Sequence, residues 1–61
     1  MRLKELRKDK GVTQKEVALA IGCSTGNYAR YERGEHEPDI ATLKSLSTYF
    51  QKSIDYIVCN D

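Results

Sequence analysis

The sequence predicts an all-α fold built from five short helices. Residues that favour helix starts and helix ends recur at short intervals along the chain. Between them, apolar residues repeat at the spacing of one helical face. No segment alternates apolar and polar residues as a half-buried strand would. The chain has 61 residues, so we expect a single domain over residues 1–61.

Capping residues mark the boundaries of the expected helices. Thr13 and Glu16 have the spacing of a capping box, and Ser24 is a favoured N-cap. Glycines that can end a helix follow three of the segments. We expect helices over residues 2–10, 14–21 and 25–33, a fourth that follows Pro38 and Asp39 and runs to Phe50, and a short fifth capped by Ser53.

Each expected helix carries apolar residues that would face a common core. In chain order, the predicted core residues are Leu3, Leu6, Val17, Ala18, Ile21, Tyr28, Tyr31, Ile40, Leu43, Leu46, Phe50, Ile54 and Ile57. A domain of this size buries only about 60% of the surface that its unfolded chain exposes. We therefore expect one modest core and no deep enclosed cleft.

The pentapeptide GCSTG, residues 22–26, matches the G-x-S-x-G pattern of the nucleophile elbow in α/β-hydrolases. That elbow requires a strand before the serine and a histidine partner, whereas helices are expected on both sides here. The only histidine, His36, lies in an acidic loop without a residue that would orient it. The segment also lacks the lysine and the strand of a phosphate-binding loop. Ser24 is therefore predicted to be a helix cap, and the protein is predicted not to be an enzyme.

Composition predicts no cofactor, metal site, small-molecule ligand or membrane span. Cys23 and Cys59 lack C-x-x-C spacing, and one histidine cannot complete a zinc site, so we expect two reduced thiols rather than a disulfide. No apolar run approaches the ~20 residues of a membrane helix, and the N-terminus lacks a signal-peptide segment. A cytoplasmic protein is expected.

Charge is distributed unevenly along the chain, although the net charge is only +1. Residues 1–34 carry a net charge of +4, and residues 35–61 carry −3. This asymmetry is typical of a basic binding face, and equally of solvated helix surfaces. The charge pattern alone leaves both interpretations open.

A tight turn at residues 22–24 joins the second and third expected helices. Such a turn sets two helices at a large angle, so that the second can enter a DNA major groove while the first crosses the backbone. The outward positions of the third helix are Thr25, Gly26, Asn27, Arg30 and Arg33. Short polar groups followed by a long arginine suit contacts with base edges.

The segment TQKEVALAIGCSTGNYARYERGEHEPD, residues 13–39, closely resembles the Cro/repressor (Xre-type) helix-turn-helix family. The similarity extends from LKELRKDKG to SIDYIV and so covers nearly the whole chain. It implies a compact five-helix, lambda-repressor-like bundle in which the second and third helices form the helix-turn-helix. It also implies binding to operator DNA as a two-fold homodimer, with residues 35–37 and 56–58 as the expected dimer contacts.

The resemblance implies roles for individual residues. Base contacts are implied for Thr25, Asn27 and Arg30. Contacts with the DNA backbone are expected from Gln14, Lys15, Ser24, Gly26 and Arg33. Gln14 is also implied to buttress the third helix. Arg7 and Glu32 match a partly buried ion pair that ties the first helix to the end of the third.

Five features depart from the family pattern, two of them being Lys52 in place of a usual apolar residue and Ser47 in place of a usual alanine. Gly26 stands where relatives usually have a side chain that can touch a base. Leu19 and Ala20 replace charged surface residues, and the loop GEHEPD is acidic although relatives often place this segment beside phosphates. We predict a sequence-specific transcriptional regulator, a repressor that reads operator half-sites with its third helix. The alternative is a protein-interaction module of the same fold, antitoxin-like or accessory.

Overall fold

Five helices follow one another along the chain in the computed structural model, which describes residues 1–59. The helices are α1 (Leu3–Lys10), α2 (Gln14–Ile21), α3 (Thr25–Arg33), α4 (Ile40–Phe50) and α5 (Ile54–Ile57). No strand occurs between residues 1 and 59. The predicted all-α class is confirmed, and α1 begins one residue later than expected.

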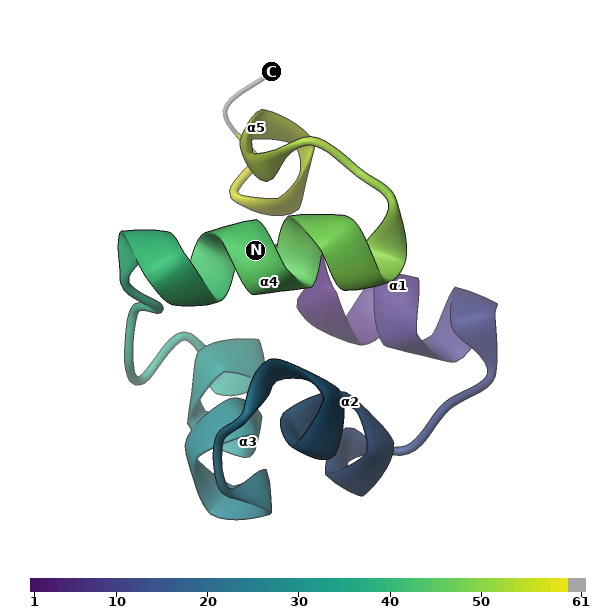
Figure 1. Cartoon of the computed structure of the whole chain (residues 1–61), viewed down its shortest axis with the longest axis vertical. Coiled ribbons are helices and arrows are strands. Elements are labelled where there is room, and N and C mark those ends of the chain that lie inside the picture. Colours follow the sequence, from purple (N-terminus) through teal and green to yellow (C-terminus); the bar gives the residue numbers. More distant parts are fainter. Residues whose placement is uncertain (60–61) are drawn as a thin grey trace.

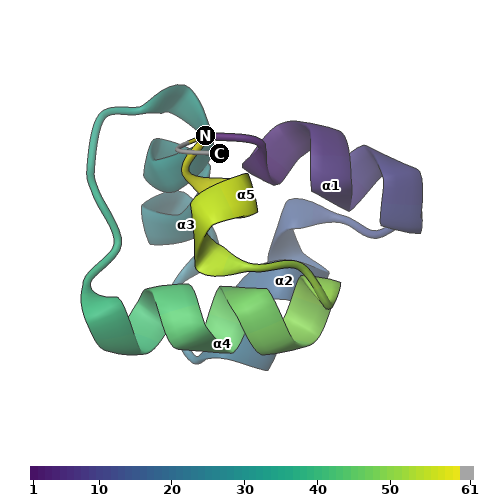
Figure 2. The ribbon, with the colours of Figure 1, turned by 90° about the horizontal axis from the view of Figure 1, so that it is seen from above.

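Helix α4 lies at the centre of the bundle. In Figure 1 it crosses the middle of the molecule, with α5 on one side and the α2–α3 pair on the other. It packs against α1, α2 and α5, while α3 packs against α1 and α2. In the view from above, α5 lies nearest to the viewer and in front of α3 (Figure 2). The Arg2 amide donates a hydrogen bond to the Ile57 carbonyl at 2.9 Å, which joins the start of the chain to α5.

The predicted N-caps Thr13, Ser24 and Ser53 all form, and Asp39 caps α4 as well. Thr13 accepts a hydrogen bond from the Glu16 amide at 3.1 Å, and the Glu16 carboxylate accepts one from the Thr13 amide at 3.3 Å. Ser24, Asp39 and Ser53 each accept a hydrogen bond from the amide three residues later. These bonds satisfy donors that a helix start leaves without an intrahelical partner. Local sequence alone therefore sets where α2 to α5 begin.

Gly22 ends α2 and shapes the turn into α3. Its φ of +79° lies in the left-handed region, where a side chain would be strained. The Cys23 amide then donates to the Ala18 carbonyl at 3.0 Å, which closes the end of α2 tightly. Because Ser24 caps α3 directly afterwards, the two helices are joined by three residues in defined conformations.

The core is formed by side chains from all five helices. Its buried residues are Leu3, Leu6, Val17, Ala18, Tyr28, Tyr31, Leu46, Phe50 and Ile57, all predicted. Ile21, Leu43 and Ile54 are half-buried. The prediction was wrong for Ile40, which is 67% exposed because it is the first residue of α4 and no other element covers it.

Both cysteines are free thiols, as expected. Cys23 packs against the edge of the core, and this burial raises the pKa of its thiol. Cys59 is exposed. None of the helices in the described chain is long and apolar enough to cross a membrane.

Candidate functional site

The first turn of α3 presents the residues that the sequence singled out. Thr25 and Gly26 are exposed, Asn27 is half-buried, and Arg30 is exposed one turn later. Ser24 uses its hydroxyl to cap the helix, so its Oγ accepts the Asn27 amide at 3.1 Å. The structure thus brings the three predicted base-contacting side chains onto a single helix of nine residues.

Asn27 is held by its side chain as well as by its backbone. Its Nδ2 donates to the Tyr31 hydroxyl at 3.3 Å, one helical turn along α3. The Tyr31 ring is buried and stacks on His36, with 5.6 Å between ring centroids. Sequence reasoning missed this role of Tyr31, although the four-residue spacing to Asn27 was a usable signal. His36 also has an aromatic partner that the sequence did not reveal.

The carboxylate of Glu32 joins three helices. Arg7 on α1 donates through Nε to Glu32 Oε2 at 2.6 Å. Gln14 on α2 donates through Nε2 to Glu32 Oε1 at 3.0 Å. The Glu32 side chain is only 3% exposed and that of Arg7 16%. The structure thus places Arg7 and Glu32 in a partly buried ion pair, and Gln14 lies against the same carboxylate on α3.

The environment of Glu32 controls its ionisation. Burial by itself would raise the pKa of this carboxyl, but hydrogen bonds from Arg7 and Gln14 outweigh burial and lower it. The buried hydroxyl of Tyr28 lies beside the same carboxylate without a hydrogen bond of good geometry, so we assign the lowering to the other two donors. Glu32 is therefore held as an anion inside the protein.

Arg33, at the end of α3, forms an exposed ion pair with Glu35. The Arg33 Nε and a Glu35 carboxylate oxygen are 2.6 Å apart, and both side chains are more than half exposed. The hydrogen bond from Arg33 lowers the pKa of the Glu35 carboxyl. An anionic ligand of Arg33 would have to compete with this carboxylate.

The remaining predicted backbone-contacting residues, Lys15 and Gly26, are both exposed. Lys15 is exposed in the first turn of α2. Gly26 is exposed and helical, and a Cβ added there would meet no atom within 4 Å. Open space at Gly26 means that the protein itself does not require glycine at this position.

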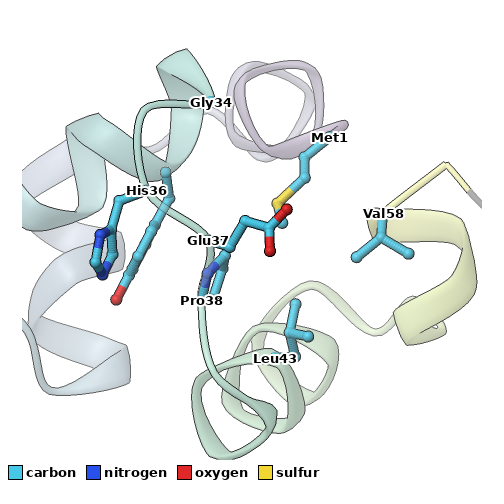
Figure 3. A pocket seen from close by; sticks show the side chains of 8 residues that line it. Met1, Gly34, His36, Glu37, Pro38, Leu43 and Val58 are labelled. Carbon is cyan, nitrogen blue, oxygen red and sulfur yellow. The ribbon is translucent and has the colours of Figure 1, made fainter.

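A hollow lies between the N-terminus, the α3–α4 loop and the end of α5. It is a half-open hollow of about 370 Å³. Figure 3 shows side chains of Met1, Glu37, Leu43 and Val58 converging on it, with His36 on the side toward α3. Among residues 1–59 there is no cluster of three His, Cys, Asp or Glu side chains that could hold a metal ion.

Comparison with known proteins gives consistent matches over nearly the whole chain. A model of the helix-turn-helix family matches residues 3–57. The HTH-type transcriptional regulator ImmR of Bacillus subtilis (strain 168) is 42% identical over 60 residues, which cover 98% of this chain and 47% of that protein. The uncharacterized HTH-type transcriptional regulator YqaE of the same strain is 39% identical over 56 residues, covering 92% and 48%.

A phage protein also matches. The cryptic phage CTXphi transcriptional repressor RstR of Vibrio cholerae is 30% identical over 57 residues, which cover 93% of this chain and 51% of that protein. The chain therefore spans about half the length of the curated relatives it matches. No solved structure matches it.

Breaking the buried ion pair should destabilise the fold. Arg7→Met and Glu32→Gln each leave one buried charge without its partner, which costs up to about 3–5 kcal/mol of unfolding free energy. Urea unfolding followed by circular dichroism measures this loss. Glu35→Gln, which removes the exposed ion pair of the same length, is the matched control and should unfold like the parent. Parental stability in both buried-pair variants would contradict the assignment.

The lowered pKa of Glu32 also predicts how stability depends on pH. Its folded pKa lies below the ordinary value of 4.5, so its contribution is fully present above pH 4.5 and is lost as the pH falls through the folded pKa. The difference in unfolding free energy between the parent and Glu32→Gln should be constant from about pH 7 to pH 5 and shrink at lower pH. A difference that stays constant down to about pH 3 would show that Glu32 does not titrate in this way.

Proposed function

Because the chain belongs to the helix-turn-helix family, we propose that it binds double-stranded DNA sequence-specifically and acts as a transcriptional repressor. The observation that carries the proposal is the exposed first turn of α3, whose helix is tied through Glu32 to α1 and α2. The names of the relatives agree with it, since ImmR and YqaE are named transcriptional regulators and RstR a transcriptional repressor.

In the proposed complex, α3 lies in the major groove and α2 crosses the DNA backbone. Thr25, Asn27 and Arg30 contact base edges. An arginine can donate two hydrogen bonds to the acceptors of guanine, and an asparagine matches the donor and acceptor of adenine. These three residues would read the bases of one operator half-site.

The proposed contacts with the DNA backbone surround α3. They come from Gln14, Lys15, Ser24, Gly26 and Arg33. Gln14 has a second amide hydrogen beyond the one that it donates to Glu32, so it can bridge α3 and a phosphate. Backbone amides at the start of a capped helix also favour phosphate. Such contacts position the protein without reading sequence.

We further propose that residues 1–61 form a single DNA-binding domain that acts as a homodimer on its operator. One recognition helix of nine residues offers little contact area, and a second copy doubles it. The hollow beside Glu37, Leu43 and Val58 adjoins both segments for which dimer contacts are expected. No catalytic role is proposed for any residue.

A second candidate function is that of a protein-interaction module. Leu19 is 72% exposed on α2, and the neighbouring Ala20 is exposed too. Exposed apolar residues of this kind can bind another protein. An affinity for DNA that does not change with salt concentration, or the absence of DNA binding, would favour this second function over the first.

Selection of bound sequences from random duplex DNA tests the proposed function directly. We expect enrichment of a palindromic sequence, and an affinity that falls steeply as salt concentration rises. Failure to enrich any sequence, with the protein shown to be folded, would contradict specific DNA binding.

Arg30 and Gln14 should differ in the kind of binding that they support. Arg30→Ala should cost about 1–3 kcal/mol of operator binding and relax the preference at one base pair per half-site. Gln14→Ala should weaken binding to all sequences alike, because phosphate contacts carry no sequence information. Binding-site selection with each variant separates the two effects. The reverse pattern would refute the assigned roles.

The dimer proposal predicts that two copies of the protein bind each operator, which titration to saturation measures. Their half-sites should lie about 10 base pairs apart, which footprinting measures. Val58→Asp places a charge in the hollow and should abolish occupation of the second half-site. Thr48→Asp, on an exposed part of α4, is the control and should bind like the parent. One molecule that saturates the operator with an asymmetric footprint would contradict the dimer.

Gly26→Ala should raise the stability of the fold but weaken binding to the operator. Alanine fits the open space without strain and should stabilise α3 by about 0.5–1 kcal/mol. We expect weaker operator binding nonetheless, because the added Cβ keeps the helix start farther from the DNA. Thermal melts and affinity measurements test both parts, and Gly26→Val should bind more weakly still. A stabilised Gly26→Ala protein with parental affinity would contradict the close approach.

A further inference from the structure

We propose that Tyr31 is a positioning residue for DNA reading: its hydroxyl orients the Asn27 amide so that this amide reads an adenine in the major groove. The inference rests on the DNA binding proposed above. It adds which residue sets the preference between bases and which base is preferred.

The contact between the two side chains lies along one face of α3. Asn27 and Tyr31 are one helical turn apart, and Asn27 Nδ2 donates to the Tyr31 hydroxyl oxygen at 3.3 Å. Asn27 is half-buried at the exposed start of the helix, whereas the Tyr31 residue is only 5% exposed. The bond therefore links a surface amide to a group anchored in the core.

The Tyr31 ring has little freedom to move. The Tyr31 ring belongs to the core cluster and is stacked on the imidazole of His36, with 27° between the ring planes and 5.6 Å between centroids. A ring held by core packing on its helix and by a second ring from the α3–α4 loop keeps its hydroxyl in one place. The hydroxyl can thus act as a fixed reference for the amide.

Asn27 is also fixed at its backbone. Its amide N–H donates to the Ser24 hydroxyl at 3.1 Å as part of the N-cap of α3. With both ends held, the two rotatable bonds of the side chain keep little freedom. A side chain ordered before binding loses less entropy when it meets its ligand.

The orientation matters because an amide presents different groups on its two sides. With one N–H donated to Tyr31, Asn27 keeps one N–H and the acceptor Oδ1. Adenine offers the complementary pair in the major groove, an acceptor at N7 and a donor at N6. Guanine offers two acceptors there, which a freely rotating amide could meet with its NH₂ group. The bond to Tyr31 opposes that rotation and so favours adenine over guanine.

The experiment measures this preference as a ratio within each protein. Selection with the parent and with Asn27→Ala identifies the base pair that Asn27 reads, and fluorescence anisotropy then compares duplexes with adenine and guanine there. We expect the parent to favour adenine roughly 5- to 150-fold. Tyr31→Phe should reduce this ratio roughly 2- to 10-fold and leave the preference at the base pair read by Arg30 unchanged. Because both affinities come from one preparation, partial unfolding cancels in the ratio.

Further variants separate positioning from general stability. Tyr28→Phe removes a buried hydroxyl on the same helix that has no hydrogen-bond partner, so its adenine-to-guanine ratio should equal that of the parent. His36→Ala keeps the Tyr31 hydroxyl but removes the stacked ring, and should lower the same ratio by a smaller factor. Tyr31→Phe added to Asn27→Ala should have no further effect on the ratio.

The outcomes distinguish this inference from the proposed function. A parent protein without any sequence preference would contradict DNA reading itself. An adenine preference lost in Asn27→Ala but intact in Tyr31→Phe would overturn the role of Tyr31. A higher ratio in Tyr31→Phe would show that the hydroxyl withholds Asn27 from the base. A base other than adenine at the Asn27 position would overturn the base assignment.

Discussion

The buried carboxylate of Glu32 is the interaction on which the arrangement of the first three helices depends. It accepts hydrogen bonds from Arg7 on α1 and Gln14 on α2, while it is itself part of α3. Arg7 also donates through Nη1 to the Val12 carbonyl at 3.1 Å, so the loop between α1 and α2 belongs to the same cluster. One negative charge thus sets where three helices and a loop lie relative to one another.

A small apolar core by itself would not fix the relative positions of the helices so precisely. Contacts between apolar side chains are non-directional, so short helices that share them can slide or rotate at little cost. Hydrogen bonds to a buried charge are directional, and a charge left without them is costly. The cluster around Glu32 therefore fixes the orientation of α3, whose exposed first turn is the candidate surface. The ring of Tyr31 and the cap at Ser24 then fix the side chain of Asn27 on that helix.

Burial, rather than distance, distinguishes the two ion pairs of the site. Arg7–Glu32 and Arg33–Glu35 have the same separation of 2.6 Å, but only the first is shielded from water. The exposed pair is screened by solvent and can exchange partners. Glu35, in the acidic loop after α3, is consequently a partner of Arg33 that a phosphate could displace. Arg7, in contrast, stays paired with Glu32 inside the protein.

Features that depend on near neighbours in the chain could be predicted from the sequence. The cap at Thr13 and Glu16 needs residues only three apart, and the end of α2 needs only Gly22, so helix boundaries could be predicted closely. The family resemblance supplied the pairing of Arg7 with Glu32. The exposure of Ile40 could not be predicted in this way, because burial depends on which distant element packs against a residue. The resemblance implied that Gln14 buttresses the third helix, but its partner Glu32 and the stacking of His36 on Tyr31 emerged only in the folded protein, since those contacts require the helices and the α3–α4 loop to be in position first.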